Sequence, residues 1–463
     1  MQCNRSGNAR LYRRSQILLA LSMGLLLYFC FWFVRGSGLI YGADPEIDQT
    51  RAVLAEEIRL AEVTEGAILD RDGQTVSEGL SPGEPGLCYQ PYAYGYLIGY
   101  SSKLYGSSGL RNRYDTVLHC GDKDGVGATL QLTTDSSLQQ YAYQLLGEMP
   151  GSIIVLDNRD GGIIALASRG ATAFNVNQID EDWENISAQE GMLLTLGVDD
   201  WTDPPGSVFK LVTAAAALEA GYTPEQLTYQ DTGSYDADGF CIRNAGNAVF
   251  GELDLCSALV NSSNTYFAGL AVSLGGYALQ QQAERFCIGT EVALDFATLH
   301  SSFDLGDMSA AGLAQTGFGQ GKTGLSPLHL AMIYQSIANE GQMLRPYLVQ
   351  RVSQGKQVLA QGKKTEIEQP VSRETARALQ EMLHQAALQY GFDEETYGWV
   401  AAKTGTAELG DGSYHIYLCG FSEQYTFVLS RNQTSAGSSS LFPAAAALLK
   451  ALRQESDNSA TLW

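Results

Sequence analysis

Three short groups of polar residues could form a site for acyl transfer. The first is the segment PPGSVFK, residues 204–210, where two prolines and a glycine stop the chain before Ser207. An apolar, alanine-rich helix is expected to open at this serine, which leaves its backbone N–H free at the positive end of the helix dipole. Lys210 lies one turn further along the same face. A lysine desolvated there can lose its proton and act as a base toward the serine hydroxyl.

This Ser-x-x-Lys pattern is weak evidence by itself. Ser207 would also suit a helix N-cap, with Lys210 as an ordinary solvated helix residue. The pattern recurs at Ser353 and Lys356, where a polar turn containing glycine argues against a catalytic role.

The second group is Ser262-Ser263-Asn264, within ALVNSSNTYFAGLA. Its apolar flanks favour polar side chains that face a cleft rather than solvent. The hydroxyl of Ser262 could relay a proton, and the amide of Asn264 could bond both a lysine and a substrate. The alternative is a simple N-cap on the helix that follows. Ser-x-Asn also occurs at residues 430–432 and 456–458, so spacing alone does not decide between them.

The third group is Lys403-Thr404-Gly405-Thr406, entered through the apolar strand WVAA. A glycine in an edge-like strand lets a ligand backbone approach closely. The lysine and the hydroxyls beside it can hold a carboxylate, and the N–H of Thr406 can point at an oxyanion. A second Lys-Thr-Gly occurs at residues 322–324, but Ser-Pro follows it directly and predicts a loop that leads into a helix.

An α+β region must position these three groups. GSIIVLDNRDGGIIALAS, residues 151–168, predicts a β-hairpin, and three consecutive strands are expected at 399–408, 414–421 and 424–431. Alanine-rich helices are expected at 208–220 and 443–453, followed by a frayed tail. Upstream, residues 66–149 are rich in turns, and AILDRDGQTV carries an Asp-Gly hairpin signal. Residues 44–63 predict an amphipathic helix.

Composition restricts the classes of protein to consider. The 463 residues are 45% hydrophobic and 10% aromatic, which excludes a disordered or collagen-like chain. A net charge of −22 makes nucleic acid an unsuitable partner. The first 16 residues contain arginines but no acid, and residues 17–34 are an uncharged apolar run long enough to cross a bilayer. The positive-inside rule then places the N-terminus in the cytoplasm and the catalytic region outside it, with a cleaved signal peptide as the alternative.

The cysteines give no metal motif. Neither a Cys-x-x-Cys pair nor a Cys/His cluster at metal spacing occurs, so we expect no structural zinc. Six cysteines follow the apolar run, and the pairs nearest in sequence are Cys88 with Cys120 and Cys241 with Cys256. Disulfides between them and free thiols are both open alternatives.

In this order, the three groups resemble the motifs of the penicillin-recognising serine acyltransferases. PPGSVFK, NSSNTYFAGLA, GQGKTGLSPLHLAMIYQSIANEGQMLRPYLV and KTGTAE together look like the transpeptidase domain of a class B penicillin-binding protein of the short Gram-positive type that serves division or elongation. GAILDRDGQTVSEG and IGYSSKLYGSSGLRNRYDTVL are similar to the pedestal segments of that family. Glu65 departs from the pattern, because an arginine usually precedes the glycine there, and the contacts of that arginine are in question.

The resemblance implies a peptidoglycan D,D-transpeptidase that β-lactams acylate and that needs no metal or other cofactor. Ser207 would attack the penultimate D-Ala of a stem peptide, Lys210 would take its proton, and Ser262 and Asn264 would relay protons and orient the peptide. The carboxylate-binding segment would be Lys403, Thr404, Gly405 and Thr406, and the N–H groups of Ser207 and Thr406 would form the oxyanion hole.

The resemblance also implies an architecture. The expected fold is α+β, an antiparallel sheet flanked by helices, with a small β-rich pedestal and a single transmembrane helix. The expected segments are a cytoplasmic tail (1–16), the anchor (17–34), a linker helix (35–63), the pedestal (64–150), the transpeptidase domain (151–455) and a tail (456–463). The implied partners are stem peptides, β-lactams, the membrane and a membrane glycosyltransferase of the division or elongation machinery.

Two rival functions remain open at this point. The acyl-enzyme could be resolved by water, as in a D,D-carboxypeptidase or a serine β-lactamase. Alternatively, the chain could bind cell-wall fragments or β-lactams without turnover, as a scaffold or sensor. Only about 16 residues precede the apolar run, which is little for a signalling module.

Overall fold

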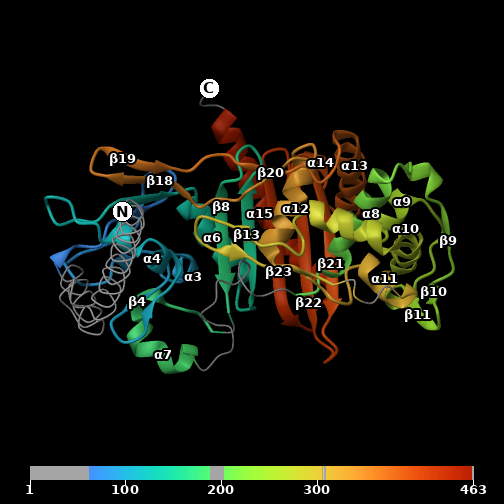
Figure 1. Ribbon diagram of the computed structural model, residues 1–463, viewed down its shortest axis with the longest axis horizontal. Coiled ribbons are helices and arrows are strands. Elements are labelled where there is room, and N and C mark those ends of the chain that lie inside the picture. The colour runs from blue at the N-terminus through green and yellow to red at the C-terminus, as the bar shows by residue number, and fades with distance from the viewer. Residues whose placement is uncertain (1–61, 171, 188–202, 305, 307–308, 461–463) are drawn as a thin grey trace, which may run out of the picture. The chain divides into compact units, whose positions relative to one another are not determined.

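The computed structural model describes residues 62–460, apart from 171, 188–202, 305 and 307–308 (Figure 1). The predicted cytoplasmic tail and membrane anchor, and nearly all of the linker helix, lie outside the described residues. Across the residues that are described, no helix combines the length and the apolarity needed to cross a membrane.

A five-stranded antiparallel sheet forms the centre of residues 151–455, the predicted transpeptidase domain, which we call the catalytic half. Its order is β21 (Val400–Glu408), β22 (Tyr414–Ser422), β23 (Tyr425–Thr434), β7 (Gly151–Asp157) and β8 (Ile163–Arg169). The predicted hairpin and the three predicted consecutive strands are therefore confirmed. Most residues of these strands are buried, as expected for a sheet covered on both faces. β21 is at the edge of the sheet, so one side of its backbone is not paired with another strand.

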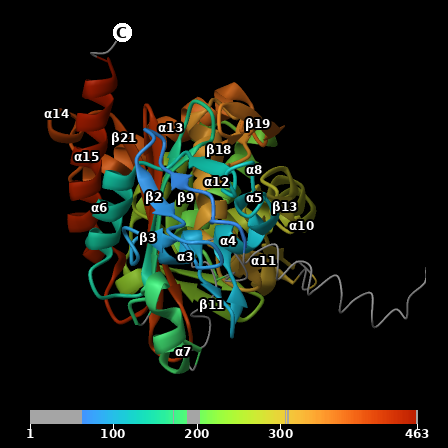
Figure 2. The same cartoon turned by 90° about the vertical axis from the view of Figure 1, so that its left-hand side faces the viewer.

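Helices cover both faces of this sheet. On one face, α12 (Pro327–Ala338) packs against β7, β22 and β23, and α13 (Arg373–Gln389) packs against β21. On the other, α6 (Ser136–Leu146) packs against β8, and α15 (Phe442–Ala460) packs against α6 (Figure 2). Helix α12 is almost completely buried, and its N-terminus has the predicted Ser326 cap with proline in the first turn.

A helical region lies beside β21 and carries the first two polar groups. It consists of α8 (Lys210–Glu219), α9 (Leu255–Val260), α10 (Asn264–Arg285) and α11 (Ala310–Gly317). The sequence predicts a helix opening at Ser207, but the α-helix begins at Lys210, after a 3₁₀ turn over Gly206–Phe209. Gly206, the first residue of this turn, has a left-handed φ of 58°, which a right-handed helix does not contain.

A second, six-stranded sheet forms the pedestal. Its order is β19 (Gln357–Gln361), β18 (Val349–Gln354), β6 (Thr129–Leu132), β1 (Ile68–Leu69), β2 (Thr75–Glu78) and β3 (Leu87–Cys88). The predicted Asp-Gly hairpin joins β1 to β2. The prediction of a pedestal confined to residues 64–150 is wrong in one respect, because β18 and β19 come from the catalytic half of the chain. β18 belongs to the pedestal sheet because it pairs antiparallel with β6.

Short elements complete the described chain. The helices are α3 (Gly95–Ile98), α4 (Gly109–Arg113), α5 (Asp115–Leu118), α7 (Ile179–Ser187) and α14 (Glu394–Tyr397). The two-stranded pairs are β4 (Ser101–Ser102) with β5 (Gly106–Ser107), β9 (Tyr229–Asp231) with β12 (Gly251–Leu253), β10 (Ser234–Ala237) with β11 (Phe240–Arg243), β13 (Val292–Ala293) with β14 (Thr298–Leu299), β15 (Ser302–Phe303) with β16 (Thr323–Gly324), and β17 (Met343–Leu344) with β20 (Glu366–Glu368).

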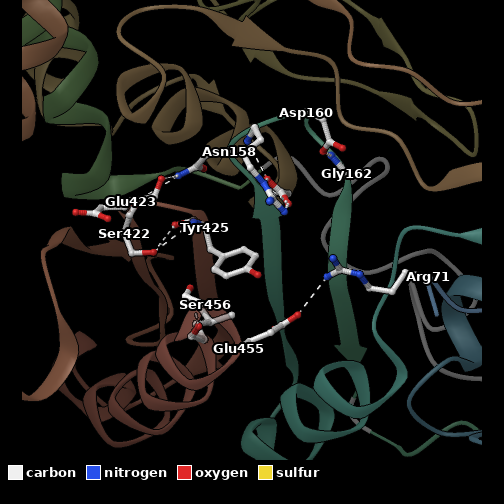
Figure 3. Close-up of polar contacts among 12 residues, drawn as sticks. Arg71, Asn158, Asp160, Gly162, Ser422, Glu423, Tyr425, Glu455 and Ser456 are labelled. Carbon is white, nitrogen blue, oxygen red and sulfur yellow. Dashed lines mark hydrogen bonds and ion pairs between the residues drawn. The ribbon is translucent and has the colours of Figure 1, made fainter. Parts of the chain in front are cut away.

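Polar contacts join the pedestal to the catalytic half (Figure 3). Arg71 reaches across to Glu455 on α15, with 3.2 Å between Nη1 and Oε1. Nearby, Asn158 donates to the carbonyl of Ser422 at 3.0 Å, which ties the turn after β7 to the end of β22.

The predicted frayed tail after residue 455 is wrong as far as residue 460, because α15 continues to Ala460. The contact of Glu455 and the bond from Ser456 to the carbonyl of Leu452 hold this last part of the helix.

The cysteines form no disulfide among the described residues. Of the two alternatives left open by the sequence, the structure has free thiols at all six positions: Cys88, Cys120, Cys241, Cys256, Cys287 and Cys419. Cys88 is buried while Cys120 is exposed, which shows that closeness in sequence did not place these side chains together.

Glu65, the departure from the family pattern, forms a buried ion pair. Its carboxylate accepts a hydrogen bond from Nε of Arg111 at 3.0 Å, and both side chains are at most 3% exposed. Arg111 also donates to Ser77 and to the carbonyls of Gly86 and Gly99, while Glu65 accepts the N–H of Gly86 at 2.8 Å. This network ties together the loops of the pedestal.

Replacing Glu65 with glutamine should destabilise the protein by roughly 3–5 kcal/mol, because it leaves the buried Arg111 charge without a partner. The measurement is chemical denaturation followed by circular dichroism. Glu84→Gln is the matched control, since the ion pair of Glu84 with Lys103 is exposed and its loss should change stability by less than about 1 kcal/mol. Equal effects of the two substitutions would contradict a structural role for the buried pair.

Candidate active site

Ser207 lies in the 3₁₀ turn that packs against β21. A Cβ on Gly206 would lie 2.5 Å from the carbonyl oxygen of Thr406, and a Cβ on Gly405 would lie 2.9 Å from the carbonyl oxygen of Pro205. Glycine is therefore required on both sides of this contact. The sequence interpretation assigned Gly405 to close approach of a ligand, whereas the structure shows that the serine turn of the protein itself makes that approach.

Lys210 is the centre of the site. Its amine lies 3.0 Å from the hydroxyl oxygen of Ser207, 3.1 Å from the hydroxyl oxygen of Ser262 and 2.8 Å from Oδ1 of Asn264. It also donates to the carbonyl of Ser262 at 2.6 Å. The side chain is completely buried. Burial, together with the positive charge of Lys403, lowers the pKa of Lys210 well below 10.5.

Ser262 connects two lysines. Its hydroxyl oxygen lies 3.0 Å from the amine of Lys403 and 3.1 Å from that of Lys210. Ser262 has a left-handed backbone, with a φ of 57°, which is uncommon for a residue with a side chain and is typical of functional sites. The hydroxyl therefore lies where a proton could pass between the two amines.

A buried polar network holds the Ser-x-Asn segment in place. Oδ1 of Asn244 accepts the N–H groups of Asn264 at 2.8 Å and Thr265 at 3.2 Å, which are free donors at the start of α10. Nδ2 of Asn244 donates to Asp231 at 2.8 Å, and Ser263 donates to the same carboxylate at 3.0 Å. Ser263 also caps α10, so the alternative interpretation of this segment as an N-cap holds for Ser263.

The Lys-Thr-Gly-Thr segment lies on β21 as predicted. Lys403 is buried, and Thr404 and Thr406 are half-buried on the face that borders the cleft. Tyr390 lies behind them, and Thr404 donates to its hydroxyl oxygen from both the N–H and the side chain. The second Lys-Thr-Gly lies elsewhere, since Lys322 is exposed and pairs with Asp304 at 3.0 Å.

These residues border one cleft of about 740 Å³. Ser207, Ser262, Asn264 and the Thr404–Thr406 segment line one part of it, and β11 and the loop after it line another. The predicted site residues are thus brought together, with Lys210 and Lys403 buried behind the lining hydroxyls.

Sequence reasoning missed Asp231, Asn244 and Tyr390. Asn244 directly follows β11, and Tyr390 directly follows α13 before a glycine, which is the ordinary pattern at a helix end. Nothing in their local sequence distinguishes these residues, because their role depends on contacts with segments far away in the chain.

A serine hydroxyl in contact with a desolvated amine, beside an open strand edge, is suited to covalent acyl transfer. The described residues contain no group of three or more His, Cys, Asp or Glu side chains placed to hold a metal ion. The arrangement is that of a serine acyltransferase of the Ser-x-x-Lys type.

Comparison with known proteins agrees with this class. Residues 151–450 match the penicillin binding protein transpeptidase domain. The chain is 30% identical over 358 residues to peptidoglycan D,D-transpeptidase PbpA of Mycolicibacterium smegmatis, across 69% of this chain and 72% of that protein. This chain therefore belongs to the penicillin-binding protein transpeptidase family and is a D,D-transpeptidase, which confirms the resemblance drawn from its motifs.

Solved structures show the same fold. The D,D-transpeptidase domain of a peptidoglycan glycosyltransferase from Eggerthella lenta superposes with a TM-score of 0.76 at 25% identity, covering 85% of this chain and 99% of that one. Penicillin-binding protein A from Mycobacterium tuberculosis, solved as a ceftriaxone acyl-enzyme complex, gives a TM-score of 0.77 at 24% identity, with coverages of 85% and 99%.

The Asn244 network generates a prediction. Asn244→Ala leaves the N–H groups of Asn264 and Thr265 without their acceptor, so we expect a loss of about 1–3 kcal/mol in stability. The rate of acylation by penicillin should fall about tenfold or more, because Asn264 is no longer held against Lys210. Stopped-flow labelling with a fluorescent penicillin measures the rate. Thr232→Ala, at an exposed position upstream of β10, is the control, and an equal rate for both variants would contradict the positioning role.

Proposed function

We propose that Ser207 is the nucleophile of a peptidoglycan D,D-transpeptidase and that Lys210 is its base. The observation that carries this assignment is the contact of one buried amine with both Ser207 and Ser262. The lowered pKa of Lys210 supports it, because an amine must be neutral to accept a proton.

The donor stem peptide would lie along the open edge of β21. Backbone groups on that edge can pair with an extended peptide, as in other complexes that add a strand to a sheet. Its terminal carboxylate would be held by Lys403, Thr404 and Thr406, as a charge-assisted contact. Gly405 contributes to binding through the close packing it permits between the strand and the serine turn.

In the first half of the reaction, Oγ of Ser207 attacks the carbonyl carbon of the penultimate D-Ala while Lys210 takes the hydroxyl proton. The N–H groups of Ser207 and Thr406 would stabilise the oxyanion; such donors are typically worth about 3–4 kcal/mol each. When the C–N bond breaks, the proton passes from Lys210, by way of Ser262, to the leaving amine of the terminal D-Ala. The product is an ester between Ser207 and the shortened peptide.

In the second half, an amine of a neighbouring stem peptide attacks this ester. Lys210 takes the proton of the amine and returns it to Oγ of Ser207 as the ester bond breaks. The new amide is the cross-link, and the enzyme is regenerated. β-Lactams would acylate Ser207 by the same first step, opening the lactam ring.

We also propose a location and a partner from the sequence. The uncharged run at residues 17–34, with arginines before it, supports a single-pass anchor with the catalytic part outside the cytoplasm. A membrane glycosyltransferase of the division or elongation machinery would then supply the glycan strands that this enzyme cross-links.

The test combines covalent labelling with a transfer assay on the full-length protein in detergent. A fluorescent penicillin should label the wild-type protein at Ser207, located by mass spectrometry, and Ser207→Ala should remove the label with no change in melting temperature. A D-Ala-D-Ala peptide with a D-amino acid acceptor should give transfer product from wild type only.

Other outcomes would contradict parts of the proposal. Label on Ser262 or Ser353 would show that the nucleophile is assigned wrongly. Hydrolysed peptide without transfer product would indicate a carboxypeptidase, and labelling without any turnover would indicate a sensor or scaffold.

A further inference from the structure

Tyr390 lies at the C-terminal end of α13 and reaches the back of the carboxylate-binding segment. It is the C-cap residue of that helix, and its ring stacks on Phe442 at the start of α15, with 5.3 Å between the ring centroids. The phenol is therefore held by two helices that flank the sheet, and its hydroxyl points to β21.

The hydroxyl oxygen of Tyr390 accepts two hydrogen bonds from Thr404 on β21. The side-chain hydroxyl of Thr404 lies 3.2 Å away and the N–H of Thr404 lies 3.4 Å away. The amine of Lys403, the neighbouring residue, donates instead to Ser262 and to the carbonyl of Thr404. Thr404 is one of the three residues to which we assign the substrate carboxylate, and Lys403 is another.

The charges around the site make the phenol oxygen of Tyr390 a favourable hydrogen-bond acceptor. In the described part of the chain, neither Lys210 nor Lys403 forms an ion pair with a carboxylate, although both are buried. Burial raises the pKa of Tyr390, but the charge of Lys403 and the hydrogen bonds from Thr404 lower it by more, so that the net pKa lies below 10. The phenol oxygen is thus an acceptor that the Lys403 ammonium attracts.

We propose that Tyr390 is a positioning residue for carboxylate recognition: its hydroxyl fixes Thr404, beside Lys403, in the arrangement that binds the carboxylate of the donor peptide or of a β-lactam. This inference rests on the proposed function of the Lys-Thr-Gly-Thr segment. Without the phenol oxygen, the Thr404 side chain rotates more freely, and Lys403 keeps Ser262 and the carbonyl of Thr404 as acceptors.

The test compares benzylpenicillin, a carboxylate, with its methyl ester, in wild type and in Tyr390→Phe. Phenylalanine keeps the stacking on Phe442 and removes only the hydroxyl. We expect the second-order acylation rate with the free acid to fall about three- to tenfold relative to that with the ester, as expected when one or two side chains must be immobilised again on binding. A melting curve of Tyr390→Phe checks that the variant is folded, so that a change in the acid-to-ester ratio reports on the site.

A second substitution shows whether Tyr390 acts through Thr404. Thr404→Val removes the donor hydroxyl. If Tyr390 acts through Thr404, adding Tyr390→Phe to Thr404→Val should not lower the acid-to-ester rate ratio any further. Tyr114→Phe is the control, because its hydroxyl bonds the carbonyl of Asp295, outside the group of site residues, and it should leave the acid-to-ester ratio unchanged.

The outcomes separate the two claims. A wild-type enzyme that acylates equally fast with acid and ester would contradict the proposed carboxylate site itself. The wild type could prefer the acid while Tyr390→Phe keeps or increases that preference. This result would overturn the positioning role of Tyr390 and leave the proposed function intact.

Discussion

The structure of the site depends on one constraint, which is that the amine of Lys210 must be kept out of water while it contacts Ser207. Desolvation favours the neutral amine, and the nearby charge of Lys403 acts in the same direction. Burying two lysines side by side is unfavourable unless their donors are satisfied. Ser262, Asn264 and backbone carbonyls supply the acceptors, and the helical region packed beside β21 excludes the solvent.

The rest of the fold holds these acceptors at fixed distances. The serine turn and β21 approach each other so closely that glycine is required at positions 206 and 405. Asp231 and Asn244 fix the N-terminus of α10, which carries Asn264. The site is therefore assembled from three segments that meet at one edge of the central sheet, and a shift of any one would separate the serine from its base.

Much of this arrangement could be predicted from the sequence. Ser207, Lys210, Ser262, Asn264 and Lys403 carry local patterns, and the alternating or apolar runs of β7, β8 and β21–β23 indicate strands directly. What could not be predicted are contacts between distant segments. The pairing of β18 with β6 joins residues about 220 positions apart, and Tyr390 and Asn244 lack any local pattern that marks their partners. The sequence left disulfides and free thiols open for the cysteines for the same reason, since closeness in sequence does not determine closeness in space.

The pH dependence of acylation is the most direct test of the central claim that Lys210 is the base. For the free enzyme, the second-order rate of penicillin acylation should rise as pH increases through the lowered pKa of Lys210, because the neutral amine is the active form, and should level off well below pH 10.5. Lys210→Arg keeps the charge but cannot deprotonate, so its rate should fall by orders of magnitude and lose this rise. A rate that rises only near pH 10.5, or an arginine variant that keeps both the rate and its pH dependence, would contradict the account.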